Sequence, residues 1–364
     1  MSSKVFLPGL NGIRAMAALA VVVSHINLGL DEFGFEKAHG LSLASFGVTV
    51  FFTLSGFLIT YLLLVEKEKT ATIVIKKFYM RRILRIWPLY FFYMLLVFCV
   101  VGSQMLGDSF WFYLFMMPNI PFALNASGGV LVTLPFLAHY WSLGVEEQFY
   151  AFWPHLIKKI KATGIFLLSF AVLFFALKLV LKFLNAPDVV QTLLHYTRFG
   201  CLAIGSLGAY VFYFKKIKPE IVQHKIVEIL AWLVFGLIVF NKFHVYSIID
   251  HEIVAVVTLV IIFNQINNPQ KLISLENPVF DYLGKISFGL YVYNPLVIYG
   301  MSVLFNMFLI QNTILKLVMV YVLVLFAVIA VSHLSYVYLE KRFLKMKTKY
   351  TTIQSAASKA ELNE

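Results

Sequence analysis

The chain has 364 residues, of which 60% are hydrophobic and only 13% are charged, and it carries 36 Phe and a formal net charge of +12. Its mean hydropathy of +0.83 lies far outside the range of soluble domains and predicts a polytopic membrane protein. The basic residues cluster at the ends of apolar runs, where the positive-inside rule places them, so the charge gives no support to nucleic-acid binding. Cys99 and Cys201 lie far apart inside apolar runs, which argues against a disulfide framework or a CxxC site.

The first apolar segment, 8–30, contains an arginine and a histidine. On a helix, the eleven positions from Arg14 to His25 bring both side chains to one face, about 16 Å apart. Ionisable groups are costly inside a membrane, and for that reason they are functional-site candidates. Arg14 also interrupts the apolar core that a signal peptide requires, and no small-residue cleavage site follows. We therefore expect the segment to remain as a helix.

The connection between the second and third apolar segments ends in an arginine cluster. Arg81, Arg82 and Arg85 stand at the cytoplasmic end of the third helix, and on a helix Arg85 is one turn from both others. Three forked guanidiniums in one patch match a ligand with several phosphates. The other interpretation is a positive-inside anchor with Trp87 at the interface.

Residues 103–140 are apolar but interrupted by three prolines and a Gly-Gly pair. Such a stretch is too broken to predict a membrane span. We expect it on the outer side as a re-entrant or interfacial segment, with two further short helices as the alternative.

The segment 141–157 supplies a second polar group. Trp141 is expected to mark the outer interface, which puts Glu146 about 7 Å deeper, close to the level predicted for His25. Ser142 and Glu146 share one helix face at i,i+4. This similar depth makes a meeting of Glu146 and His25 possible.

Two interpretations of Glu146 stay open. It either forms a structural ion pair with Arg14 or Arg198, or it takes part in catalysis or acceptor binding. Arg198 and Lys178 are more simply expected to snorkel to lipid headgroups.

Ten apolar segments are long enough to cross a membrane. They lie at 8–30, 45–65, 86–102, 141–157, 164–184, 194–214, 228–243, 251–267, 287–308 and 312–337. The sequence therefore predicts an all-α fold, a polytopic transmembrane bundle of about ten helices.

The basic connections decide the predicted orientation. The loops 66–85, 158–161 and 215–218 and the C-terminal KRFLKMKTK all fall on one side if the N-terminus is cytoplasmic. Both termini are then cytoplasmic. We expect one membrane domain over 1–340, followed by a basic and then polar tail over 341–364.

Five motifs, in this order, resemble those of the acyltransferase type 3 family of integral membrane O-acyltransferases. They are LPGLNGIRAMAALAVVVSH, FFTLSGFLIT, FYMRRILRIWPLY, WSLGVEEQFY and GKISFGLYVYNPLVI, and they cover nearly the whole chain. The resemblance implies transfer of an acyl group, usually acetyl, from cytoplasmic acyl-CoA to a hydroxyl of a cell-envelope or exported carbohydrate. It also implies a multi-pass protein of a bacterial-type cytoplasmic membrane.

The resemblance assigns roles to particular residues. Arg14 and His25 match the essential arginine and histidine of the R-x10-H pattern. The RRxxR motif, expected to bind acyl-CoA, corresponds to Arg81, Arg82 and Arg85, and the W-S-L-x-x-E motif corresponds to Trp141, Ser142 and Glu146.

Two positions depart from the family pattern. Asn294 stands where many members have a histidine, and Arg342 stands where a proline often follows the late Glu-Lys. The chain therefore has an amide where the family pattern has that second histidine.

The expected mechanism has a donor site and a base. The nucleotide of acetyl-CoA, or of another short acyl-CoA, is held by the arginine cluster, and its arm runs past Arg14 to present the thioester near His25. Neutral His25 removes the proton from the acceptor hydroxyl, which enters from the outer side, and Glu146 orients the imidazole or binds the sugar. Trp141 and Ser142 are predicted to contact substrate.

Two further alternatives remain at this stage. A covalent acyl-enzyme would use Ser55 or Ser142 as nucleophile. A carrier or flippase for a lipid-linked saccharide would favour structural repeats and interrupted helices near the midplane, and neither is evident in the sequence. No metal is expected, and the predicted partners are acyl-CoA, a carbohydrate acceptor and membrane lipids.

Overall fold

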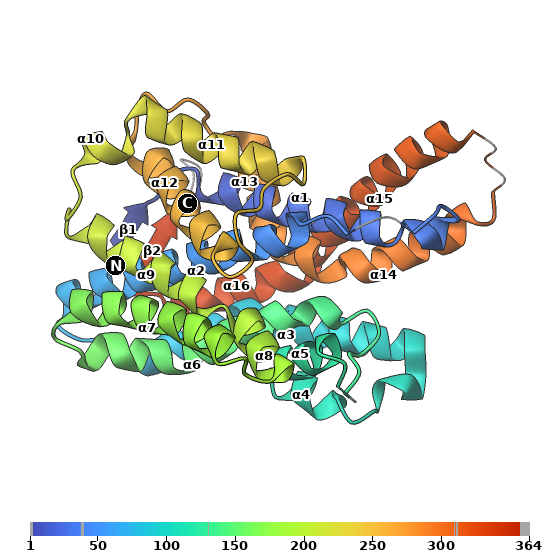
Figure 1. Cartoon of the computed structure of the whole chain (residues 1–364), viewed down its shortest axis with the longest axis horizontal. Helices are drawn as coiled ribbons and strands as arrows, with labels where there is room; N and C mark the ends of the chain where they lie inside the picture. The colour runs from blue at the N-terminus through green and yellow to red at the C-terminus, as the bar shows by residue number, and fades with distance from the viewer. Residues whose placement is uncertain (1–2, 38–39, 130, 309, 311, 357–364) are drawn as a thin grey trace.

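The computed structural model describes residues 3–37, 40–129, 131–308, 310 and 312–356. This part of the chain is a bundle of helices with one parallel pair of short strands (Figure 1). The strands are β1 (Ser3–Phe6) and β2 (Ile353–Ala356), and the helices are α1 (Leu10–Leu28), α2 (Leu43–Thr70), α3 (Ile75–Val101), α4 (Phe110–Leu114), α5 (Asn119–Ala126), α6 (Trp141–Lys159), α7 (Thr163–Phe183), α8 (Asp188–Thr197), α9 (Phe199–Tyr213), α10 (Pro219–Val222), α11 (Lys225–Val239), α12 (Asp250–Asn267), α13 (Pro278–Lys285), α14 (Ser287–Phe305), α15 (Thr313–Ser335) and α16 (Lys341–Lys347).

Seven helical stretches among the described residues are long and apolar enough to cross a membrane. They are Leu10–Leu28, Leu43–Thr70, Ile75–Met105, Thr163–Phe183, Asp250–Asn267, Ser287–Phe305 and Thr313–Tyr350. The predicted multi-pass helical membrane protein is thus confirmed. The count of about ten helices and the cytoplasmic placement of the termini stay predictions.

The predicted span 194–214 is two helices rather than one. Arg198 separates α8 from α9 and adopts a left-handed backbone conformation with φ of 43°. Its guanidinium donates to the Ser45 carbonyl and hydroxyl at 2.8 Å and lies 5.1 Å from the ring centroid of Trp141. Arg198 is only 3% exposed, so the expectation that it snorkels to headgroups is wrong. The inward-turned guanidinium is thus hydrogen-bonded through its two terminal nitrogens, and the left-handed residue interrupts the helix.

The segment 103–140 folds into short pieces against the bundle. α5, the longest of them, has eight residues and a length of about 12 Å, against about 30 Å for the hydrocarbon core. None of these pieces is long enough to span, which favours the re-entrant or interfacial interpretation over two further spans.

The helices approach closely where glycines face a neighbouring backbone. A Cβ on Gly56 of α2 would lie 2.0 Å from the Leu202 carbonyl oxygen of α9, and a Cβ on Gly205 would lie 2.1 Å from the Thr53 carbonyl oxygen. Small residues at such contacts drive helix association in membranes. Because Gly56 faces α9, the adjacent Ser55 is directed toward a different side of α2.

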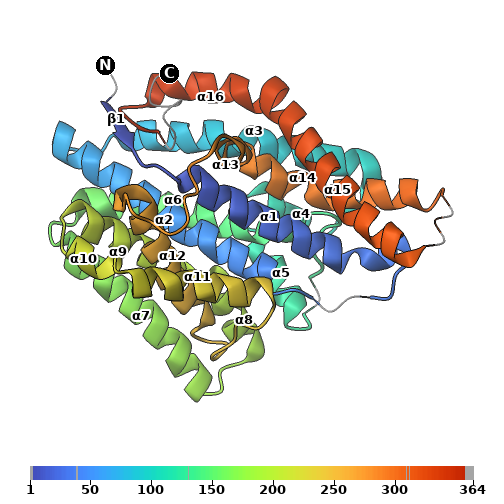
Figure 2. The ribbon, with the colours of Figure 1, turned by 90° about the horizontal axis from the view of Figure 1, so that it is seen from above.

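Both described ends of the chain lie at the same end of the bundle, where β1 pairs in parallel with β2 (Figures 1 and 2). α15 continues through a π-helical turn, Tyr336–Glu340, into α16, which packs against α3. The described part of the predicted tail, 341–356, is therefore folded onto the membrane domain. Residues 357–364 lie outside the described part, and the predicted boundary at 340 stays a prediction.

Candidate active site

A cavity of about 520 Å³ opens among α1, α2, α3, α6, α14 and the C-terminal segment. Its volume is typical of small-molecule sites, which run to about 300–1,000 Å³. We call it the cationic cavity. Its polar lining includes Arg14, Ser55, Arg81, Arg82, Arg85, Ser142, Glu146, Tyr150, Lys285, Tyr291, Lys341, Lys345 and Lys347.

The arginine cluster is only partly neutralised by the protein. Arg81 forms an ion pair with Glu66 at 3.2 Å and donates to the Tyr350 carbonyl at 2.9 Å. Arg82 lies 5.8 Å from the ring centroid of Tyr150. Within the described part of the chain, neither Arg82 nor Arg85 has a carboxylate oxygen within 4 Å. The cavity therefore presents positive charge that a polyanionic ligand would neutralise.

Glu146 is held by two hydroxyls inside this cavity. Ser55 donates to its Oε1 at 2.8 Å, and Tyr150 donates to its Oε2 at 2.9 Å. The predicted ion pair with Arg198 does not form, because the Arg198 guanidinium is bonded to Ser45. Arg14 lines the same cavity and donates to Asn11 Oδ1 at 3.1 Å.

Among the described residues, Glu146 is bonded to Ser55 and Tyr150 and not to His25. Trp141 is buried under Arg198, and His139, two residues before it, already lies beside His25 with ring centroids 6.3 Å apart. α6 thus begins at the level of His25. Glu146, seven residues beyond His139, lies about 10 Å deeper.

A hydrogen-bonded pair marks the end of the cavity nearest to His139. The Tyr291 hydroxyl donates to the His139 carbonyl at 2.6 Å, so Ser142 Oγ is the donor in its own 2.6 Å bond with the Tyr291 oxygen. The rings of His139 and Tyr291 lie 5.3 Å apart. Ser142, Tyr291 and His139 therefore stand between the cationic cavity and His25.

We call His25, His139 and Asn294 the imidazole cluster. His25 Nδ1 lies 2.5 Å from Asn294 Oδ1, and His139 Nε2 lies 3.1 Å from the Val292 carbonyl oxygen. His139 is buried, and its Nδ1 has no hydrogen-bond partner among the described residues. The cluster contains no charged side chain.

The structure thus divides the predicted site residues into two groups. Arg14, Ser142 and Glu146 line one cavity together with the arginine cluster, and His25 and Trp141 are not part of that lining.

Sequence reasoning missed three residues of these groups. His139 stands two positions before the W-S-L-x-x-E motif, and this proximity was its one available signal. Asn294 was noted only as a departure from the family pattern, although it bonds directly to His25. Lys347 was assigned to a tail, but it lines the cationic cavity.

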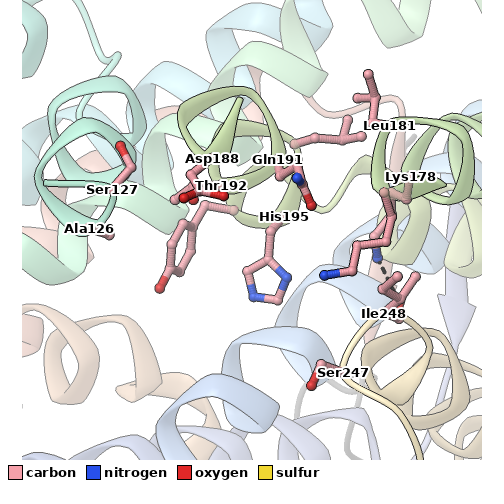
Figure 3. Close-up of a pocket in the computed structure, with 13 residues that line it drawn as sticks. Ala126, Ser127, Lys178, Leu181, Asp188, Gln191, Thr192, His195, Ser247 and Ile248 are labelled. Atoms are coloured by element: carbon pink, nitrogen blue, oxygen red, sulfur yellow. Dashed lines mark hydrogen bonds between the residues drawn. The ribbon is translucent and has the colours of Figure 1, made fainter. Parts of the chain in front are cut away.

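A second pocket of about 500 Å³ lies among α7, α8 and the turn at 247–248 (Figure 3). Lys178 there donates to the Ile248 carbonyl at 3.0 Å and pairs with Glu252 at 2.7 Å, so its predicted snorkelling is wrong. α8 is not among the seven candidate spans. Burial, together with the charges of Arg198 and Lys178, lowers the pKa of His195 to about 4, so its ring is neutral at pH 7. None of the predicted site residues lines this pocket.

No group of three or more His, Cys, Asp or Glu side chains that could hold a metal ion occurs among the described residues. The side chains that line the cationic cavity carry guanidinium, amine, hydroxyl and carboxylate groups.

Comparison with known proteins gives one family. The family model described as "Acyltransferase domain" matches residues 7–337. A Staphylococcus aureus (strain COL) protein that is provisionally named an O-acetyltransferase is 27% identical over 335 residues, covering 80% of this chain and 51% of the relative. The peptidoglycan O-acetyltransferase OatA of Listeria monocytogenes is 33% identical over 168 residues, covering 42% of this chain and 24% of the relative.

The O-acetyltransferase OatA of Staphylococcus aureus (strain NCTC 8325) is 28% identical over 242 residues, covering 63% of this chain and 38% of the relative. The chain spans about half the length, or less, of these curated relatives. No solved structure matches the chain.

Proposed function

The chain belongs to the family of the acyltransferase domain, and from that premise we propose that it is a membrane O-acyltransferase. The acyl group, which we take to be acetyl, moves from acyl-CoA to a hydroxyl of a cell-envelope or exported carbohydrate. The observation that carries this proposal is the cationic cavity, in which Arg82 and Arg85 have no ion-pair partner among the described residues and lie beside buried hydroxyls and a carboxylate.

The donor site follows from the charges of the cavity. Coenzyme A carries a pyrophosphate and a 3′-phosphate, which match the guanidinium forks of Arg82 and Arg85. The pantetheine arm runs past Arg14 and Ser55 toward Ser142 and Tyr291. Lys347 of the C-terminal segment lines the same cavity, near Arg82 and Arg85.

The transfer step uses the imidazole of His25. Its Nε2 takes the proton of the acceptor hydroxyl as the oxygen forms a bond to the thioester carbonyl carbon. The C–S bond breaks, and the coenzyme A thiolate takes up a proton from the imidazolium. General-base catalysis of this kind contributes about 10²–10⁴-fold to the rate. Ser142 and Tyr291 lie between the cavity and His25. Their hydrogen bond therefore has to break when the thioester moves from the cavity toward His25.

Direct transfer fits the geometry better than an acyl-serine. Ser55 is bonded to Glu146, which in turn is bonded to Tyr150, and Arg82 covers the Tyr150 ring. Ser55 is therefore close to the phosphate end of the donor, whereas the thioester lies at the far end of a long arm. Ser142, the other nucleophile candidate, donates its proton to Tyr291 rather than to a base.

The acceptor is proposed from the relatives. The Listeria protein is named for peptidoglycan, and we propose a hydroxyl of an envelope glycan for this chain as well. Donor and acceptor enter from opposite sides, with the arginine cluster facing the cytoplasm. In a cysteine-free background, a cysteine at Glu36 should react with an impermeant thiol reagent in intact cells, while one at Lys69 should resist it. Labelling at Lys69 alone would place the cluster on the side without coenzyme A.

The activity is tested with purified protein in nanodiscs, acetyl-CoA labelled in the acetyl group and a soluble glycan fragment as acceptor. The proposal expects label on the glycan and release of free coenzyme A in equal amounts. Saturable movement of a lipid-linked saccharide without loss of the acetyl group would show a carrier instead.

A further inference from the structure

Asn294 is the hydrogen-bond partner of His25, and its own amide is fixed on both sides. The residue is fully buried in α14. Its Nδ2 donates to the Leu290 carbonyl at 3.0 Å and to the Tyr291 carbonyl at 2.6 Å, and its Oδ1 faces His25 Nδ1 at 2.5 Å. Both amide hydrogens are thus bonded to backbone oxygens.

The reversed amide is unfavourable at this position. In that orientation Oδ1 would face the two carbonyl oxygens, and no hydrogen would lie between these three acceptors. A buried polar group without a hydrogen-bond partner is costly. The carbonyl oxygens of Leu290 and Tyr291 therefore determine that Asn294 presents an acceptor to the imidazole.

This acceptor determines the tautomer of His25. An amide oxygen only accepts, so the Nδ1 of a neutral imidazole has to carry the hydrogen, and its lone pair then lies on Nε2. His25 makes no other hydrogen bond in the described ranges, so Nε2 is not blocked by a donor of the protein.

His139 reinforces the neutral character of this region. Its Nε2 faces the Val292 carbonyl and therefore carries the hydrogen, which leaves a lone pair on Nδ1. His139 consequently supplies neither a positive charge nor a donor to the neighbouring His25. A ligand hydroxyl is the donor that this pair of imidazoles lacks.

We propose that Asn294 is a positioning residue that holds His25 with its proton on Nδ1, so that Nε2 receives the proton of the acceptor hydroxyl. The inference rests on the proposed function, in which His25 is the base. When Nε2 gains the proton, Nδ1 still donates to Asn294, so the same hydrogen bond also stabilises the imidazolium that forms during transfer.

Nitrogen-15 NMR of protein labelled at histidine, in nanodiscs, tests the tautomer directly in the unmutated chain. Signals that disappear in His25→Ala belong to His25. The proposal expects a protonated Nδ1 and an unprotonated Nε2 at pH 7. A protonated Nε2 with an unprotonated Nδ1 would overturn it, whatever the activity of the protein.

Three variants, two at Asn294 in α14 and one at Asn306 directly after this helix, test whether the hydrogen bond to His25 affects catalysis. Asn294→Leu keeps a similar volume but removes the acceptor, and it should lower the turnover of acyl transfer about tenfold, the equivalent of one lost hydrogen bond. The KM for the donor should not change. Asn294→His should restore most of the rate, because one ring nitrogen accepts from His25 while the other donates to a carbonyl. Asn306→Leu is the matched control, since Asn306 donates to the Glu32 carbonyl and not to His25.

Wild-type turnover and an unchanged tautomer in Asn294→Leu would overturn the positioning role. Failure of the proposed function gives a different result, because His25→Ala would then keep its transfer activity. The two failures are therefore distinguishable.

Discussion

The cationic cavity and the imidazole cluster are neighbours in one bundle, but basic side chains line the first and uncharged hydrogen-bond acceptors surround the second. In the cavity, Arg82 and Arg85 have no ion-pair partner within the described part of the chain, and Lys347 lies near them. In the cluster, Asn294 Oδ1 bonds to the imidazole of His25, and the Val292 carbonyl oxygen bonds to the imidazole of His139. Free positive charge suits the binding of phosphates, whereas a neutral, oriented imidazole suits proton transfer.

The boundary between the two regions is narrow. The Ser142–Tyr291 hydrogen bond and the His139 ring separate them. Under the proposed function, donor binding and proton transfer depend on different residues, so mutations should affect affinity in one region and turnover in the other.

The largest effect is expected from His25→Ala. Acyl transfer should fall by about 10²–10⁴-fold, the range of a general-base contribution, while the affinity for acetyl-CoA is kept. Turnover and donor binding are measured on the purified protein. His333→Ala is the matched control, because His333 is bonded to Tyr282 away from both regions. Loss of donor affinity in His25→Ala would contradict the separation of donor binding in the cavity from proton transfer in the imidazole cluster.

The second effect concerns Arg82→Ala and Arg85→Ala. Each should weaken acetyl-CoA binding about tenfold or more, since a hydrogen bond to a charged group contributes about 1.5–3 kcal/mol, and turnover at saturating donor should stay close to wild type. Calorimetry measures the affinity. For the arginine that contacts the 3′-phosphate, the mutation should weaken the binding of dephospho-CoA less than the binding of acetyl-CoA. Lys76→Ala, an exposed change on the same helix, should have no effect.

How far the sequence predicted these regions depends on the kind of contact. Arg14 and His25 lie on one helix, so helical periodicity was enough to relate them. The Nδ1 of His25 and the Oδ1 of Asn294, which are 269 positions apart, meet only because α14 packs against α1. No local pattern carries that information.

Other differences have local physical causes. Trp141 was taken as an interface residue, whereas it is buried beneath Arg198, a contact that the sequence does not show. The break at Arg198 was missed because an apolar run of adequate length gives no sign that one residue will turn its charge inward. The packing of residues 341–356 was missed because a basic segment after a span is normally solvated.

A third, smaller effect is expected from Lys347→Ala. A bound phosphate would favour the charged form of Lys347, so removing this side chain should lower donor affinity about threefold to tenfold, less than the loss of a guanidinium with bidentate hydrogen bonds. The loss should shrink at high salt, because screening weakens it. Lys349→Ala provides the control from the same segment, since Lys349 does not line the cavity. Equal effects of both changes would remove Lys347 from the donor site.

The smallest effect is expected from Ser55→Ala. The hydroxyl supplies one of two hydrogen bonds to Glu146, and direct transfer does not require it as a nucleophile. Turnover should stay within about tenfold of wild type, the range of one neutral hydrogen bond. A complete loss of transfer in a folded protein, with an acyl group trapped on Ser55 of the wild type, would replace direct transfer by a covalent route.

The most direct test of the division between the two regions is single-turnover transfer at saturating donor, measured beside equilibrium donor binding in the same samples. His25→Ala should bind acetyl-CoA as tightly as wild type and transfer about 10²–10⁴-fold more slowly. The double variant Arg82→Ala/Arg85→Ala should bind weakly, yet transfer at nearly the wild-type rate once the donor is saturating. Equal loss of binding and of saturated transfer in both proteins would contradict the assignment of donor binding to the cationic cavity and of proton transfer to the imidazole cluster.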